Sequence, residues 1–264
     1  MNYFKEKAKK HVEYMDNYYS KDTLSSAYNT VTYTGPLKKI DWTAKGQETK
    51  NRLLSRNTVD ALKYIYNTTC SAKPQKVALL NFADYEVPGG CFLEGATTQE
   101  EDLCHHSNLY NILRSFTPSY YRINGENTNR GLYTDRALYI PNVVFIEDKD
   151  KNFRHREDVV KADVITCAAP NWEEARDLGV SATENTLVFA QRIQFIKDIA
   201  EAQNVDILIL GAWGCGVFGQ NPKMTAQLFN FIFKKSSVKH IVYAIPKSLT
   251  SQNFEIFSER IKES

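Results

Sequence analysis

The stretch VALLNFADYEVPGGCFLEGATTQEE, residues 77–101, joins the features that decide the fold and the candidate site. Val77–Phe82 is a short apolar run of the kind that forms a buried strand. Gly89 and Gly90 then mark a turn at which a backbone can come close to a ligand. Glu100 and Glu101 end the stretch. Two adjacent carboxylates in a pocket of low dielectric cannot both ionise easily, so we expect one to stay protonated near neutral pH. A poised acid beside a glycine turn suits glycoside chemistry.

Each part of this stretch also has a purely structural explanation. A pair of glycines is usually only a turn, and a pair of glutamates at the start of a helix favours the helix dipole. Such short motifs match by chance. The functional interpretation therefore rests on the whole stretch, together with two segments further along the chain.

Strands and helices alternate from Lys76 onward. The strands that we expect after the first one are Ala137–Ile140 and Val143–Ile146 around Pro141, Asp163–Cys167, Asp206–Leu210 and Ile241–Ile245. The expected helices are Gln99–Arg114, Glu184–Ala202, one from Pro222 to about Lys235, and one at the end of the chain. The alternation predicts a three-layer α/β fold with a largely parallel core sheet.

Residues 1–72 are predicted to form a small, mainly helical N-terminal extension, followed by one domain over residues 73–264. The extension is polar, rich in Tyr and Lys and weakly patterned. Asn57 can cap a helix whose apolar residues up to Tyr66 share one face. Ser71–Pro74 then breaks the chain. The charge run Asp148–Lys151 is expected to be a solvated loop.

Composition excludes several classes of protein. With 42% hydrophobic and 24% charged residues, the 264-residue chain is globular rather than disordered. No apolar run is long enough to span a membrane, and the first seven residues lack the apolar core of a signal peptide. A net charge of +2 argues against a protein that grips duplex DNA, but it allows a phosphate ligand held by backbone amides. The odd number of cysteines and the lack of a Cys-x-x-Cys pair predict free thiols in a reducing cytoplasm: Cys70, Cys91, Cys104, Cys167 and Cys215.

Three segments that can carry chemistry each follow a predicted strand. Asn81–Asp84 ends the first strand, Ala168–Asn171 follows the strand Asp163–Cys167, and Gly211–Gly219 lies between a strand and a helix. Ligands of open α/β sheets bind at the carboxyl ends of the strands. Four glycines in nine residues let several backbone amides of the last segment point at one anion. This loop lacks the Gly-Lys-Ser/Thr of a Walker loop and the spacing of a dinucleotide fingerprint.

Together these segments resemble the bacterial-type poly(ADP-ribose) glycohydrolases, whose usual signature is three glycines, a short spacer and Gln-Glu-Glu. The resemblance covers Lys76 to about Ile245 and includes Gly46–Thr49 in the extension. It rests on four blocks, namely Gln99–Glu101 with Leu103–Cys104, Ser107–Tyr110, Ala169–Asn171 and Gly211–Gly219. It implies a macrodomain fold with a mixed, largely parallel sheet, and an ADP-ribosyl glycohydrolase that requires no cofactor and no metal.

The resemblance also implies roles for individual residues. Glu101 is the catalytic acid, which protonates the leaving oxygen at the anomeric carbon of ADP-ribose and then activates water as a base. Glu100 binds substrate hydroxyls and helps to keep Glu101 protonated. The substrate diphosphate stabilises the oxocarbenium-like transition state. The implied substrate-binding residues are Asp84, Gly89, Gly90, Cys91, Gln99, Asn171, Gly214, Cys215, Gly216, Val217, Phe218, which packs on the terminal ribose, and Gly219.

Two residues depart from the family pattern. Cys91 stands where a third glycine is usual, and Asp84 stands where Asn or Ser is usual. Both departures weaken the expectation of polymer cleavage more than the expectation of ADP-ribose recognition. A mono-ADP-ribosyl-protein hydrolase, for example one acting on arginine linkages, is therefore one alternative. A non-catalytic ADP-ribose-binding macrodomain is the other alternative, although a protein that only binds ADP-ribose has no need of a buried acid.

The expected partners are ADP-ribose, poly(ADP-ribose) or ADP-ribosylated proteins, with no membrane and no strong nucleic-acid signal, and we expect a cytoplasmic monomer. Cys104-His105-His106 could be read as metal ligands, but adjacent histidines on a helix point about 100° apart. Cys215 could be a nucleophile, but it has no histidine nearby in sequence. We expect its small size to serve close packing.

Overall fold

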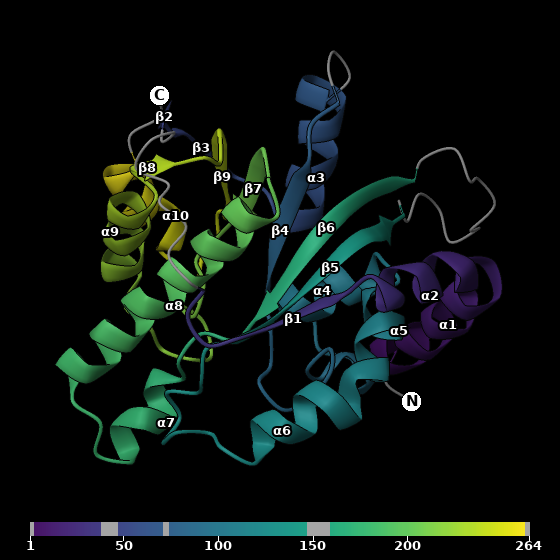
Figure 1. Ribbon diagram of the computed structural model, residues 1–264, viewed down its shortest axis with the longest axis horizontal. Coiled ribbons are helices and arrows are strands. Elements are labelled where there is room, and N and C mark those ends of the chain that lie inside the picture. The colour runs from purple at the N-terminus through teal and green to yellow at the C-terminus, as the bar shows by residue number, and fades with distance from the viewer. Residues whose placement is uncertain (1–2, 38–46, 71–73, 147–158, 262–264) are drawn as a thin grey trace.

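A seven-stranded sheet with helices on both faces forms the centre of the computed structural model, which describes residues 3–37, 47–70, 74–146 and 159–261 (Figure 1). Across the sheet the order is β1 (Val31–Thr34), β5 (Arg136–Phe145), β6 (Val160–Cys167), β4 (Val77–Phe82), β7 (Ile207–Leu210), β9 (His240–Ala244) and β3 (Lys50–Leu54). β6, β4, β7, β9 and β3 run parallel, whereas β5 pairs antiparallel with both β1 and β6. The predicted mixed, largely parallel α/β fold is confirmed.

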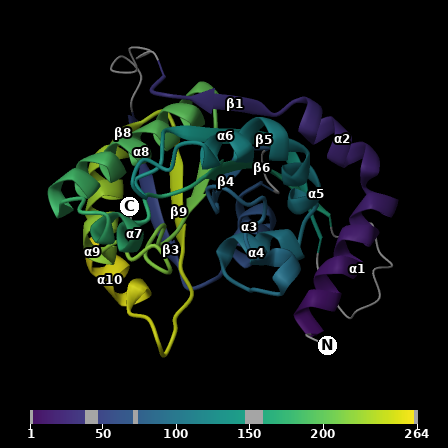
Figure 2. The ribbon, with the colours of Figure 1, turned by 90° about the horizontal axis from the view of Figure 1, so that it is seen from below.

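Helices cover the two faces of this sheet, as Figure 2 shows. In β4, Ala78 and Leu80 point to one face, and Val77 and Leu79 point to the other, as the period of a strand requires. The first face packs against α8 (Ala182–Ala202), α9 (Pro222–Ile232) and α10 (Asn253–Arg260). The second packs against α3 (Thr58–Ile65), α4 (Gln99–His105) and α5 (Leu109–Leu113). The remaining short elements are α6 (Arg122–Gly125), α7 (Trp172–Asp177), the strand pair β2 (Gln47–Glu48) and β8 (Lys235–Ser236), and helical turns at Tyr66–Cys70, Phe92–Glu94, Arg114–Phe116 and Thr117–Tyr121.

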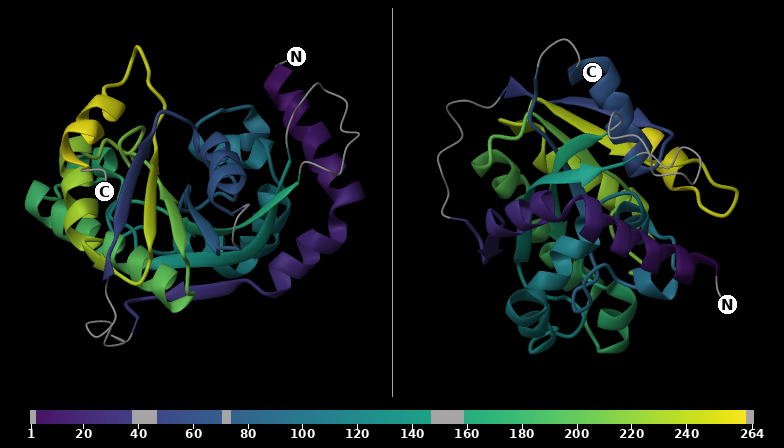
Figure 3. Two further views of the ribbon diagram at one scale, coloured as in Figure 1. Left: turned by 90° about the horizontal axis from the view of Figure 1, so that it is seen from above. Right: turned by 90° about the vertical axis from the view of Figure 1, so that its right-hand side faces the viewer.

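The N-terminal residues add two helices and both edge strands to this core. Figure 3 shows α1 (Tyr3–Tyr18) and α2 (Ser20–Tyr28) along one side of the molecule and β3 beside β9 at the opposite edge of the sheet. His11 of α1 is buried, and its Nε2 lies 2.8 Å from the carbonyl oxygen of Ser107. The proposed domain boundary at residues 72 and 73, and the segments Gly46 and Asp148–Lys151, lie outside the described residues. The two-part division therefore stays a prediction.

Two local signals for helix starts are confirmed. The Asn57 side chain accepts a hydrogen bond of 2.7 Å from the backbone N–H of Asp60 and caps α3. Pro222 occupies the first turn of α9, behind the capping residue Asn221. α9 ends at Ile232, three residues before the predicted end at Lys235.

The prediction of one helix over Gln99–Arg114 is wrong, because α4 ends at His105 and α5 begins at Leu109. Ser107 Oγ donates to the carbonyl of Leu103 and accepts from the N–H of Leu109, at 2.7 and 3.1 Å. Asn108 Oδ1 accepts a hydrogen bond of 2.9 Å from Val144 N in β5. Short polar side chains thus compete with the helical backbone and tie the break to the sheet.

The two predicted strands around Pro141 form one strand, β5, because its ladder with β6 continues past an irregularity between Ile140 and Val143. Asn142 there has a φ of 56°, and the irregularity is of the bulge type. None of the described helices combines the length and the apolar character that crossing a bilayer requires.

Candidate active site

A cavity of about 710 Å³ opens at the carboxyl ends of β4, β7 and β9. One wall is the start of α4 with the loop that precedes it. The opposite wall consists of residues 212–214 and 216–218 after β7 and of residues 244–246, 248, 251 and 253 at the end of β9 and beyond it. Ligand sites of parallel sheets lie at this end.

Ten of the fourteen predicted site residues line the cavity: Asp84, Gly90, Cys91, Gln99, Glu100, Glu101, Gly214, Gly216, Val217 and Phe218. The other four, Gly89, Asn171, Cys215 and Gly219, do not line it. The lining also includes residues that the sequence did not single out, chiefly Asn57, Thr58, Ala96, Thr97, Thr98, Ala244, Ile245, Pro246, Ser248, Ser251 and Asn253.

Both carboxyl oxygens of Glu100 accept hydrogen bonds from N–H donors. Oε1 accepts from Asn81 Nδ2 at 2.9 Å, and Oε2 accepts from the backbone N–H of Asp84 at 2.7 Å. The side chain is buried, and this burial raises the pKa of Glu100 to about 8 despite the opposing effect of the two donors. Burial thus keeps the Glu100 carboxyl neutral near neutral pH.

Glu101 is fixed by the loop that precedes α4 in the cavity wall. Its Oε1 accepts from the backbone N–H of Cys91 at 3.0 Å, and its Oε2 accepts from the hydroxyl of Thr98. Gly90 has a φ of +57°, and a Cβ there would lie 2.6 Å from Glu101 Oε1 and 3.1 Å from Glu100 Oε2. Only glycine fits, so the glycine turn and the acid pair are packed against each other.

Gln99 ties the start of α4 to the end of β4. Its Nε2 donates to the carbonyl of Leu80 at 2.9 Å and to Thr58 Oγ1 at 3.1 Å, and its Oε1 accepts from Phe82 N at 2.8 Å. Both the oxygen and the nitrogen of the Gln99 amide therefore have hydrogen-bond partners within the protein. The contacts give Gln99 a positioning role for the two acids that follow it.

The two departures from the family pattern are accommodated without strain. Cys91 has a φ of −92°, which any residue adopts, and its side chain is exposed. Asp84 Oδ1 accepts from the backbone N–H groups of Glu86 and Val87, both at 2.8 Å, and shapes the turn that leads to the glycines.

The Gly211–Gly219 loop has two parts. Its base, around Gly214, is held by hydrogen bonds, and its crest, around Gly216, is open. The base is closed by the N–H of Gln220, which donates to Gly214 O at 2.9 Å, while Gln220 Nε2 donates to Pro170 O at 2.8 Å. A Cβ added at Gly216 would meet no heavy atom within 4 Å. The crest at Gly216 therefore faces open space in the cavity wall.

The Ala169–Asn171 segment supports this loop from outside the cavity. Asn171 caps α7 by accepting from Glu174 N, and the next N–H, of Trp172, donates to Phe218 O at 2.8 Å. The ring of Phe218 packs edge-on against Tyr133, with 6.0 Å between the ring centroids. Tyr133 in turn stacks on Tyr85 at 4.1 Å.

The alternative metal and nucleophile sites have other functions in the structure. The His105 ring packs against Phe92 at 4.7 Å, whereas His106 Nδ1 lies 3.3 Å from a carboxylate oxygen of Asp102. The Cys215 thiol donates to Thr225 Oγ1 at 3.4 Å, and burial raises its pKa to about 12. A thiol with such a pKa is a poor nucleophile, which agrees with a packing role.

Comparison with known families decides which chemistry this geometry serves. Residues 3–148, more than half of the chain, match the family described as "Microbial-type PARG, catalytic domain", where PARG is poly(ADP-ribose) glycohydrolase. The chain belongs to this family. It is a glycohydrolase, as the sequence predicts. Comparison with the curated proteins gives no match.

Solved structures of bacterial PARG enzymes share the fold. The PARG of Thermomonospora curvata bound to the inhibitor ADP-HPD is 27% identical, with a TM-score of 0.82 over 97% of this chain and 98% of that chain. The PARG of Deinococcus radiodurans in complex with ADP-ribose is 26% identical, with a TM-score of 0.75 over 91% of this chain and 97% of that chain.

Proposed function

We propose that this enzyme removes ADP-ribose from poly(ADP-ribose) by hydrolysing the glycosidic bond at the anomeric carbon, with Glu101 as acid and then base. The observation that carries the proposal is the place of the Glu101 carboxyl. It lies in the cavity wall, where Cys91 N and the Thr98 hydroxyl fix its two oxygens.

In the first step, the Glu101 carboxyl gives its proton to the leaving oxygen as the bond from that oxygen to the anomeric carbon breaks. The leaving group departs as a hydroxyl of the shortened polymer. In the second step, the Glu101 carboxylate takes a proton from water, whose oxygen bonds to the anomeric carbon. Free ADP-ribose results, and Glu101 is protonated again.

Two features of the cavity support this sequence of steps. The raised pKa keeps Glu100 neutral below about pH 8, so Glu100 adds no second negative charge beside an anionic substrate. The open crest of the glycine loop at Gly216 offers room for the diphosphate against backbone amides. The diphosphate then lies close enough to stabilise the positive charge that develops on the ribose.

Neither departure from the family pattern favours the mono-ADP-ribosyl hydrolase. Cys91 keeps an ordinary backbone conformation and still donates its N–H to Glu101. The Asp84 side chain is turned to backbone N–H groups of its own loop. We therefore assign the polymer as the substrate.

We also propose that the enzyme is a cytoplasmic monomer whose partners are ADP-ribose-containing molecules. The support for the compartment is that all five cysteines are free thiols: Cys70, Cys91, Cys104, Cys167 and Cys215.

The proposal is tested by measuring ADP-ribose release from poly(ADP-ribose) and, in parallel, from arginine-, serine- and glutamate-linked mono-ADP-ribosylated proteins. We expect release from the polymer at a rate well above that from any of the three proteins. Release from one of the mono-modified proteins alone would replace the polymer as the substrate.

A further inference from the structure

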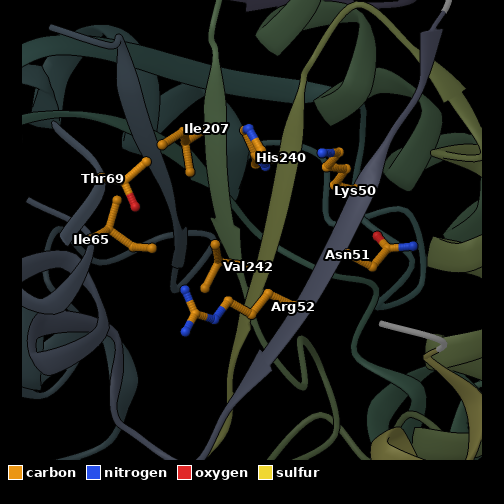
Figure 4. A pocket seen from close by; sticks show the side chains of 8 residues that line it. All are labelled: Lys50, Asn51, Arg52, Ile65, Thr69, Ile207, His240 and Val242. Atoms are coloured by element: carbon orange, nitrogen blue, oxygen red, sulfur yellow. The ribbon is translucent and has the colours of Figure 1, made fainter. Parts of the chain in front are cut away.

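A second cavity, of about 500 Å³, lies at the amino ends of β7, β9 and β3, the end of the sheet opposite to the catalytic cavity (Figure 4). Its apolar lining comes from Ile65, Ile207 and Val242. Lys50 and Arg52 of β3 and His240 of β9 line its other side. The proposed function assigns nothing to this cavity.

The cations beside this cavity form no ion pair with a carboxylate of the described residues. Of the nine arginines in the described part of the chain, six form an ion pair: Arg114, Arg122, Arg130, Arg176, Arg192 and Arg260. Arg52 and Arg56 do not. Their guanidinium carbons instead lie over the ring of Tyr64, at 4.9 and 5.0 Å from its centroid, and Arg52 Nη2 donates to Tyr64 Oη at 2.6 Å. Lys50 likewise pairs with no carboxylate among the described residues.

The electrostatic surroundings are positive on the β9 side too. His240 has a lowered pKa because burial, Lys50 and Lys239 all disfavour its charged form. Asp206, the acid that opposes this effect, forms an ion pair with Lys239 at 2.5 Å. Cations gathered on one ring without counter-charges repel one another, and an anion bound there relieves that repulsion.

The basic side chains of this segment lie along the chain between the second cavity and the catalytic cavity. Arg56 directly precedes Asn57 and Thr58, which line the catalytic cavity. Six residue-to-residue steps separate Lys50 from Arg56, which corresponds to about 20 Å in an extended chain. Lys50, Arg52 and Arg56 with Tyr64 therefore form a basic track between the two cavities.

We propose that this basic track binds an ADP-ribose unit of the polymer that lies outside the catalytic cavity. The inference rests on the proposed polymer substrate and adds a second binding site for it. The diphosphate of that unit pairs with the arginine guanidinium groups, whose planar fork suits phosphate oxygens. Its adenine packs on the apolar lining of the second cavity and on the guanidinium planes.

The test is polymer binding by protein that cannot hydrolyse it. Glu101→Gln protein is compared with the same protein carrying Arg52→Glu and Arg56→Glu. Both are titrated with poly(ADP-ribose) of defined length and with free ADP-ribose. The matched control carries Lys9→Glu and Lys234→Glu, two exposed lysines outside the track. A second variant, Arg52→Gln with Arg56→Gln, serves if charge reversal disturbs folding.

We expect the track variants to bind polymer about tenfold or more weakly, with free ADP-ribose affinity unchanged and a smaller dependence of polymer binding on salt. The lysine control should bind polymer like the parent protein. Equal polymer affinity in parent and track variants overturns the site. Displacement of the polymer by an equal length of poly(A) RNA also overturns it, because the track is then a general polyanion surface.

This design separates the two proposals. If the wild-type enzyme releases no ADP-ribose from polymer while the track variants still lose polymer binding, the proposed reaction fails and the site stands. If release occurs and polymer binding is unaffected, the reaction stands and the site fails.

Discussion

At the scale of single residues, the two acids of the cavity are held by different donors. Glu100 accepts from Asn81 and Asp84, which belong to β4 and the loop after it. Glu101 accepts from Cys91 and Thr98, which belong to the loop before α4. Their contributions can therefore be separated by substitution.

Thr98→Val keeps the shape of the side chain and removes the hydroxyl that holds Glu101. Thr98 makes no capping bond to the α4 backbone, so the helix should survive. Losing a hydrogen bond to a carboxylate should lower kcat roughly tenfold or more, with KM little changed. Thr98→Ser should restore the rate. Steady-state kinetics on polymer provide the measurement, and wild-type kcat in Thr98→Val would show that this contact does not orient the acid.

Glu100 makes the stability of the fold depend on pH. Its pKa is raised to about 8 in the folded state, so its contribution is complete below the unfolded-state pKa and is lost as pH rises through 8. Between pH 5 and 8, the free energy of unfolding should fall by about 3 kcal/mol more in wild type than in Glu100→Gln. Denaturant unfolding of both proteins at the two pH values measures this. Parallel pH dependence would mean that Glu100 ionises normally in the fold.

The sequence predicted the position of the acids but not how they are held. The bonds of Gln99 to Leu80, Phe82 and Thr58 could not be predicted, because they join segments that meet only when α4 packs on the sheet.

At the scale of elements, Gly216 is the position of the glycine loop at which a side chain meets no neighbouring atom. Gly216→Val would project into open space, whereas a Cβ at Gly214 would lie 2.8 Å from Gln220. Gly216→Val should weaken ADP-ribose binding at least tenfold by calorimetry, with an unchanged circular dichroism spectrum, and Gly216→Ala should have a smaller effect. Wild-type affinity in Gly216→Val would place the diphosphate elsewhere.

The strands that were predicted as continuous apolar runs are those buried on both faces. β4, β7 and β9 read as continuous apolar runs because helices cover both of their sides. β1 and β3 escaped prediction because they are edge strands. Lys50 and Arg52 are exposed in β3, and most of β1 faces solvent, so neither strand carries an apolar run.

At the scale of the whole molecule, the first helix packs against the loop that precedes α4 in the candidate site. Lys5 forms an ion pair with Glu94, and a Cβ on Gly95 would lie 2.9 Å from the backbone nitrogen of Lys5. His11 lies 6.4 Å, ring to ring, from Phe92, which follows the residue that donates to Glu101. The N-terminal segment therefore contacts the loop that holds the candidate site, although its weak sequence pattern gave no sign of this.

The fold thus brings the acid pair of α4 and the glycine loop after β7 to one end of a parallel sheet. The central claim is that Glu101 performs the proton transfers there. Its direct test is Glu101→Gln, which keeps the shape and the contact with Cys91 but has no proton to transfer. We predict that ADP-ribose release from polymer falls by at least about a hundredfold while calorimetry shows ADP-ribose still bound. Release at a rate near that of wild type would contradict the assignment.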